Sequence, residues 1–386
     1  MKFPRQAFAW SRVPTGLLGM LALVVACERF VDRHDMQLMT PHELDWKTAG
    51  RTVSSEAPRA EVLCFGDSML KFGLAPRLLE ARLGRPMFSL ALLDGKPAAS
   101  YFLLKRAIDA GARPKLILVD FQPDCLYQSP TSLTDNPHPK SLLSLAEAAD
   151  LALSCDEPAY FGRTAAARIF PSLRCRVEIR QAVRLAVQGL GGTNPLENAK
   201  IARNRTLNRG GLTLAKQPLY DGGVPPKTAE IMLSDQWFGR PEHAKYVRRF
   251  FGLAGAHGIT AVWVVPPNTP RVEATRLENG QAARYDRFID RVLHRYPNVT
   301  LVDARKSGYD HTVFVDPVHL DRDGATTLSL DVADALASIL AGGTSSRTAN
   351  RRVELPHYRK VDSAVVLEDV GQSEARIVSR ASATVR

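Results

Sequence analysis

The chain reads Val62-Leu63-Cys64-Phe65-Gly66-Asp67-Ser68-Met69, an apolar run that gives way to a small polar turn. Uninterrupted apolar residues are typical of a strand that is buried on both faces of a parallel sheet. Gly66 and Asp67 end this strand. Apolar residues at helical spacing then follow Ser68, at positions 70, 74, 78, 79 and 83. The segment therefore predicts a strand, a tight turn and a helix, with Ser68 at the carboxyl end of the strand.

The same alternation of strand and helix continues on both sides of a long central block. The predicted strands cover residues 61–65, 87–93, 116–121, 259–265 and 299–302, and the predicted helices cover residues 98–110, 243–256, 281–296 and the segment after Gly324. Strands that alternate with helices indicate a doubly wound α/β sheet. Active sites in such sheets gather at the carboxyl ends of the strands. Ser68, Gly95 and Gln122 each follow such an end.

The rest of the chain divides into four further segments. Residues 1–34 predict a signal anchor, and residues 35–57 predict a linker that leads to the main domain at 58–343. Between about 127 and 242 the strand–helix rhythm is lost, and residues 146–153 and 177–190 predict helices. This block predicts a mainly helical insertion or cap over the active-site face. Residues 344–386 lack periodicity, which predicts a mostly disordered tail.

A second motif, Phe314-Val315-Asp316-Pro317-Val318-His319-Leu320, lies just before the closing helix. It places a carboxylate and an imidazole three residues apart. With the hydroxyl of Ser68, these groups are the parts of a serine-hydrolase triad. Two plainer interpretations remain open: Ser68 as the N-cap of a helix, and His319 as a surface histidine in a loop that contains proline.

The two motifs together resemble the SGNH, or GDSL-like, hydrolase superfamily, which has a Gly-Asp-Ser block near its start and an Asp-x-x-His block near its end. The resemblance covers roughly residues 58–126 and 243–342. It implies a flavodoxin-like α/β/α sandwich. It also implies Ser68 as the nucleophile, His319 as the base and Asp316 as the carboxylate that orients His319.

The resemblance further implies an oxyanion hole made by the backbone N–H of Ser68, by Gly95 and by an amide after the third strand. There the family has Gly-x-Asn-Asp, whereas this chain has Asp120-Phe121-Gln122-Pro123. Gln122 either supplies the same amide or is an ordinary polar loop residue. This departure puts catalytic efficiency in doubt, and it leaves the expected fold unchanged.

The composition favours acidic partners. The chain has 386 residues, of which 45% are hydrophobic, and a formal net charge of +11. A basic protein suits anionic lipid, acidic glycan or nucleic acid. We expect no nucleic acid, because the chain has no zinc-finger spacing, basic helix or aromatic-basic ribbon. We expect no metal and no cofactor, and the sequence leaves the oligomeric state open.

The N-terminus has the form of an export signal. Lys2, Arg5 and Arg12 precede an apolar run from Gly16 to Cys27, which predicts an uncleaved anchor with its N-terminus inside the cytoplasm. The domain would then face the periplasm or the extracellular side. A cleaved signal peptide is one alternative, and lipidation of Cys27 in the lipobox-like Val24-Val25-Ala26-Cys27 is another. Outside the cytoplasm, Cys155 and Cys175 could form a disulfide.

Two functions follow from these patterns. The first is an exported serine esterase or O-acyltransferase, with an acylated glycan or a small ester as substrate. The anchor, the first 60 residues after it and the closing motif are similar to those of envelope proteins related to the alginate O-acetyltransferases. This resemblance implies O-acetyl transfer to, or removal from, an envelope polysaccharide. The second is a non-catalytic envelope scaffold or glycan-binding protein of the same fold. Hydroxyl and imidazole within hydrogen-bond reach would favour the enzyme.

Overall fold

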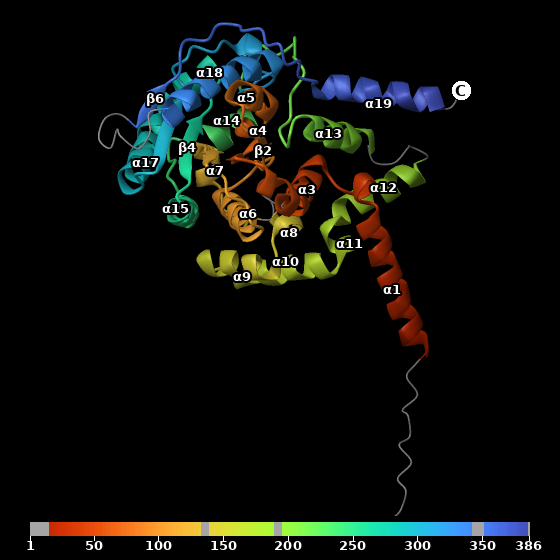
Figure 1. Ribbon diagram of the computed structural model, residues 1–386. Coiled ribbons are helices and arrows are strands. Elements are labelled where there is room, and N and C mark those ends of the chain that lie inside the picture. Colours follow the sequence, from red (N-terminus) through yellow and green to blue (C-terminus); the bar gives the residue numbers. More distant parts are fainter. Residues whose placement is uncertain (1–14, 133–138, 189–194, 342–350, 385–386) are drawn as a thin grey trace, which may run out of the picture.

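A single sheet of six parallel strands forms the centre of the protein (Figure 1). The computed structural model describes residues 15–132, 139–188, 195–341 and 351–384. The strand order is β2-β1-β3-β4-β5-β6. The strands are β1 (Val62–Phe65), β2 (Met87–Ser89), β3 (Leu116–Val119), β4 (Thr260–Val265), β5 (Val299–Asp303) and β6 (Arg352–Glu354). The α/β class and the positions of the first five strands are as predicted, but β2 ends at Ser89 instead of residue 93 and β3 at Val119 instead of residue 121.

Helices cover both faces of this sheet, because successive residues of each strand point to opposite sides. Leu63, Ile117 and Trp263 belong to one hydrophobic core, and Cys64 and Leu118 belong to the other. The first core is packed by α3 (Pro41–Glu56), α6 (Pro97–Asp109), α15 (Pro241–Ala256) and α17 (Gln281–Arg295). The second is packed by α4 (Ser68–Gly73), α5 (Pro76–Leu83) and α18 (Arg322–Ala341). Strands β1 to β5 are therefore largely buried on both sides, as their apolar runs require, whereas the edge strand β6 is partly exposed.

The helix expected after Ser68 is two helices. Asp67 caps α4, and the chain is extended at Leu74 before Pro76 opens α5. Proline disfavours the helical conformation in the residue before it, so one continuous helix is interrupted there. Leu70, Leu74 and Leu79 still pack in one core on the same face of the sheet, whereas Leu78 packs against Leu367.

The predicted linker at residues 35–57 is wrong. These residues form α2 (Asp35–Leu38), α3 and a final turn of 3-10 helix. Trp46, Ala49 and Val53 of α3 are fully buried in the core, and the indole N–H of Trp46 donates to the carbonyl of Leu93 over 2.7 Å. Because the apolar face of α3 is narrow and most of its other residues are polar, the helical spacing of apolar residues is weak in this part of the sequence.

The central block is mainly helical, as predicted. It contains α8 (Pro139–Leu142), α9 (Leu145–Ser154), α10 (Pro158–Ile169), α11 (Pro171–Arg174), α12 (Arg176–Val187), α13 (Pro195–Leu207) and α14 (Pro226–Met232), after the short α7 (Pro123–Tyr127). Only part of it lies near the catalytic motifs: Met232 of α14 packs against Met69 and Val318. Cys155 and Cys175 are both thiols, and they pack in different hydrophobic clusters.

The predicted disordered tail is also wrong for the residues that the structure describes after 350. Strand β6 pairs in parallel with β5, and α19 (Val370–Thr384) packs against α13. In the segment that connects β6 to α19, Leu355 is buried in one core of the sheet and Leu367 is buried against Ala75 and Leu78. A strand of three residues, such as β6, is too short to give a periodic signal in the sequence. It forms because the outer edge of β5 offers hydrogen-bond partners to its backbone.

The N-terminal helix α1 (Thr15–Arg33) projects from the body of the protein (Figure 1). The side chains of Leu17, Leu21 and Val25 are exposed along it. In the described part of the chain, α18 is the one helix that is long and apolar enough to cross a membrane by length and composition. Leu328, Val332 and Leu336 of α18 are fully buried in the core, as in a helix of a soluble domain.

Candidate active site

The turn between β1 and α4 leaves no room for a side chain at Gly66. Gly66 has a φ of +125°, and a Cβ atom there would lie 1.6 Å from Asp120 Oδ1. The same carboxylate oxygen accepts the backbone N–H of Asp67 over 2.8 Å, and Asp67 Oδ1 accepts the N–H of Met69 over 2.7 Å. These contacts set Ser68 as the first residue of α4, with its side chain partly exposed.

The structure brings Ser68, His319 and Asp316 into one chain of hydrogen bonds. His319 Nε2 lies 2.8 Å from Ser68 Oγ, and His319 Nδ1 lies 2.6 Å from Asp316 Oδ2. The other oxygen of Asp316 accepts the backbone N–H groups of Val318 and His319 over 3.0 and 2.9 Å. Asp316 therefore holds the imidazole with Nδ1 as donor, which leaves Nε2 to accept the serine proton.

The charges around His319 favour its protonated form. Burial alone would lower the pKa of His319, but the hydrogen bond and charge of Asp316 outweigh burial, and the charges of Asp67 and Asp124 add to them, so this pKa is raised. Burial alone would raise the pKa of Asp316, and the hydrogen bond and charge of His319 lower it instead. The site thus stabilises the imidazolium–carboxylate pair that forms when the histidine takes a proton.

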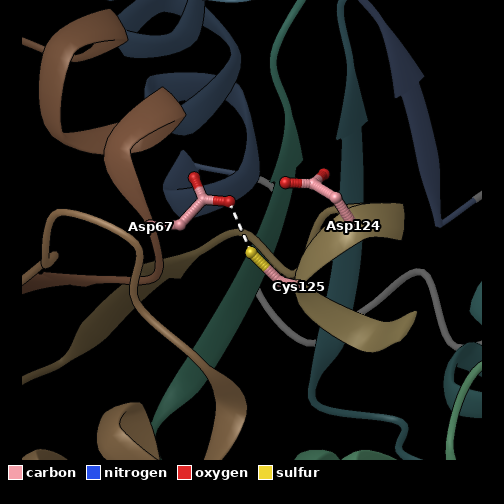
Figure 2. A group of neighbouring side chains, drawn as sticks. All are labelled: Asp67, Asp124 and Cys125. Atoms are coloured by element: carbon pink, nitrogen blue, oxygen red, sulfur yellow. Dashed lines mark hydrogen bonds between the residues drawn. The ribbon is translucent and has the colours of Figure 1, made fainter. Parts of the chain in front are cut away.

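An acidic cluster lies behind the nucleophile, and sequence reasoning missed it. Figure 2 shows the carboxyl groups of Asp67 and Asp124 facing each other, while the thiol of Cys125 donates to Asp67 Oδ2 over 2.7 Å. Asp124 and Cys125 come from α7, which follows β3. Nothing in the local sequence marks Asp124 and Cys125, because their role depends on the contact between α7 and Asp67 in the turn after β1.

One of these three side chains is held in a form that does not bind a metal. Each offers one ligand atom, and the three atoms lie within 4.8 Å of one another. A thiol binds a metal as the thiolate. However, burial and then the charges of Asp67 and Asp124 raise the pKa of Cys125 well above its usual range. The protonated thiol donates to Asp67 Oδ2, whereas Asp124 Oδ1 is buried and has no hydrogen-bond partner among the described residues.

The two predicted oxyanion residues lie at the same edge of the sheet but differ in what they offer. The N–H of Gly95 already donates to the carbonyl of Leu92 over 3.1 Å, and a Cβ at Gly95 would lie 2.2 Å from the carbonyl oxygen of Gly66. The absence of a side chain at Gly95 thus permits its backbone to approach that of Gly66. To donate to a substrate, the N–H of Gly95 would first have to break its hydrogen bond to Leu92. Its role as a donor stays a prediction.

Gln122 is fully buried, and neither atom of its side-chain amide has a hydrogen-bond partner among the described residues. Such an amide is costly to bury, so it is a candidate to act on a ligand. Among the described residues, no group accepts the backbone N–H of Ser68. The N–H of Ser68 and the amide of Gln122 are therefore the better candidates for oxyanion donors.

Two further residues near the imidazole were not anticipated. The ring of Phe72 stands edge-on to that of His319, with centroids 5.0 Å apart. Burial lowers the pKa of His42, and the charge of His319 acts on it in the same direction, whereas the charges of Asp94 and Asp45 oppose this. His42 lies in the first turn of α3. Because residues 35–57 were predicted to be a linker, nothing placed this turn beside the catalytic motifs.

No family model matches the chain, and no curated protein matches it.

Proposed function

We propose that the protein is a membrane-anchored serine esterase or O-acyltransferase of the SGNH type. The observation that carries the proposal is the hydrogen-bonded chain from Ser68 Oγ through His319 to Asp316. A serine, a histidine and an aspartate in this order are the parts of nucleophilic acyl transfer on several unrelated folds. Neither plainer interpretation, a helix N-cap for Ser68 or a surface loop residue for His319, requires the two side chains to meet.

The geometry supports the following reaction. Ser68 Oγ attacks the carbonyl carbon of an ester while His319 Nε2 takes the hydroxyl proton, and the carbonyl electrons move to the oxygen. Asp316 stabilises the imidazolium, and the backbone N–H of Ser68 and the amide of Gln122 would donate to the oxyanion. The carbon–oxygen bond to the leaving alcohol then breaks, and His319 returns the proton to that alcohol. Water or an acceptor hydroxyl completes the cycle in the reverse sense.

The strand order also supports the finer fold assignment. The sequence β2-β1-β3-β4-β5 is the order of flavodoxin-like doubly wound sheets, in which ligands bind outside the carboxyl ends of the strands near the point where the order reverses. Ser68 follows β1 at that point. Strand β6 is an addition beyond this order.

For the substrate, we propose an O-acetylated glycan of the cell envelope. The apolar, exposed side chains of α1 suit an anchor in the membrane, and the basic N-terminal flank suits an orientation with the domain outside the cytoplasm. A net charge of +11 suits an acidic polymer as the partner of such a domain.

The alternative is a non-catalytic scaffold or glycan-binding protein of the same envelope. The engaged N–H of Gly95 favours this alternative, because it removes one of the three donors that the resemblance implies. The two proposals differ in whether Ser68 is a reactive nucleophile.

Labelling with a serine-directed fluorophosphonate tests this difference. The full chain is purified in detergent, and we expect covalent labelling that is lost in Ser68→Ala and retained in Ser338→Ala, a control at an exposed serine of α18. Absence of labelling in the parent, or labelling that survives Ser68→Ala, would favour the scaffold.

A further inference from the structure

A second surface, far from the triad in the chain, is both apolar and basic. Six exposed apolar side chains lie on α10, α11 and α12 and on the residue that joins α10 to α11. They are Phe161, Ile169, Phe170, Leu173, Val183 and Val187, and we call them the α10–α12 surface. Large exposed apolar patches are uncommon on soluble domains, and they mark contacts with proteins or membranes.

The α10–α12 surface is continuous with the apolar side chains of α1. One pocket, with a volume of about 510 Å³, lies between α1 and α12 and includes Phe30 and Val183 in its lining. Another, of about 360 Å³, lies between α1 and the α10–α11 segment and includes Val24 and Ile169. The apolar side chains therefore extend from α1 onto both of its neighbours.

Polar contacts hold α1 in one orientation against this surface. The carboxylate of Glu28 accepts the backbone N–H of Ser172 over 2.8 Å and also the hydroxyl of Ser172. Asp32 lies 3.4 Å from Lys47 Nζ and 3.6 Å from Arg174 Nη2. Because these contacts come from α11 and α3, the direction in which α1 leaves the domain is set by the fold.

The charge beside the apolar side chains is positive. From Pro158 to Val187 the basic residues are all arginines, and the one acidic residue is Glu178. Arg163, Arg176, Arg180 and Arg184 are exposed there. Exposed arginines next to apolar side chains are the pattern of helices that lie in the interface of an anionic membrane.

We propose that the α10–α12 surface rests on the anionic phospholipid headgroups of the membrane that α1 enters. The arginines would pair with lipid phosphates, and the exposed apolar side chains would lie just below them. This inference rests on the proposed anchoring by α1, and it goes further: the insertion is a second membrane contact, which sets how the catalytic edge of the sheet faces the lipid. A protein partner is the competing occupant. The arginines and the continuity with α1 favour lipid.

Site-specific quenching tests this contact. The full chain carries Cys27→Ser and Cys155→Ser, which remove the thiols that are not buried, and either Val187→Cys or Leu219→Cys, both highly exposed positions at 83% and 95%. It is then labelled with nitrobenzoxadiazole. Leu219 lies in the loop between α13 and α14 and serves as the matched control. The labelled protein is reconstituted into vesicles of phosphatidylcholine and phosphatidylglycerol that contain doxyl-labelled acyl chains.

We expect strong quenching by doxyl lipid at position 187 and none at position 219. Vesicles without phosphatidylglycerol, or the triple change Arg176→Gln, Arg180→Gln and Arg184→Gln, should reduce the signal at 187 toward that at 219. Flotation with the vesicles reports anchoring by α1 independently. Flotation without quenching at 187 overturns the surface contact alone, and failure to float overturns the proposed anchoring as well. A probe at 187 that is shielded from iodide but not quenched by lipid overturns the proposal in favour of a protein partner.

Discussion

Lys71 and Asp45 form an ion pair in which both side chains are fully excluded from solvent, with Nζ 2.8 Å from Oδ1. Lys71 follows Ser68 by one turn of α4, and Asp45 belongs to α3. Asp45 Oδ2 also accepts the N–H of Leu93 over 3.0 Å, and its other oxygen lies 3.4 Å from Arg205 Nε. Burial lowers the pKa of Lys71 to about 8, and the charge of Asp45 opposes that shift. One buried carboxylate thus ties α3, α13 and the loop after β2 to the helix that carries the nucleophile.

We expect Asp45→Ala to destabilise the protein by about 3–5 kcal/mol, because removal of one partner leaves a buried charge without compensation. Urea unfolding, followed by circular dichroism, measures this loss. The control is Asp109→Ala, which removes an exposed pair with Lys105 and should cost less than about 1 kcal/mol. Equal midpoints for the two variants would contradict a structural role for α3.

We expect His319→Ala and Ser68→Ala to remove nearly all turnover of an activated acetyl ester, and to do so to a similar extent. The two groups act on the same proton, so loss of either disables the unit. The measurement is kcat on p-nitrophenyl acetate. His311→Ala provides a control at a partly exposed histidine in the same part of the chain. Turnover that is undiminished in either site variant would rule out the triad.

The pH profile should depend on Asp124. His319 must be neutral to accept the serine proton, so activity rises as the pH passes upward through the pKa of His319. The charge of Asp124 helps to raise that pKa. Asp124→Asn should therefore lower it and move the acidic limb of kcat/KM to lower pH. Asp334→Asn, at an exposed position on α18, should leave the limb in place. A limb that stays fixed in Asp124→Asn, or moves to higher pH, would refute this electrostatic role.

We expect Gln122→Ala to lower kcat by on the order of a hundredfold, the typical cost of one lost oxyanion donor. The buried amide without a partner among the described residues is the reason. The unfolding midpoint is measured in parallel, because a merely structural role would change stability and leave kcat nearly intact. A kcat within about twofold of the parent, far below a donor effect, would make Gln122 an ordinary loop residue.

We expect removal of residues 344–386 to destabilise the fold. This truncation deletes β6 from the edge of β5, together with the buried Leu355 and Leu367 and the packing of α19 on α13. Limited proteolysis and thermal unfolding compare it with a control that lacks only residues 385 and 386. Identical protease resistance and midpoints would mean that the tail adds nothing to stability.

The catalytic candidates were visible in the sequence because their signals are local. Gly66-Asp67-Ser68 interrupts an apolar run, and Asp316 and His319 lie within one loop. The acidic cluster could not be predicted from the sequence, since Asp124 and Cys125 come close to Asp67 only when α7 packs beside the turn after β1. In the same way, the family resemblance implied Gly95 as a donor, whereas the folded backbone directs its N–H to Leu92.

The sequence by itself determined the strand-and-helix alternation around the first five strands, because side-chain burial imposes a period or an apolar run on each element. It also determined which functional groups follow the strands, namely the hydroxyl of Ser68 and the amide of Gln122. Only the tertiary structure decided that α3 and β6 belong to the domain, because a narrow apolar face and a short edge strand acquire their stability from partners distant in the chain. It likewise decided that His319 meets Ser68 across 251 residues, because that contact depends on the order of the strands and the packing of the helices rather than on any local pattern.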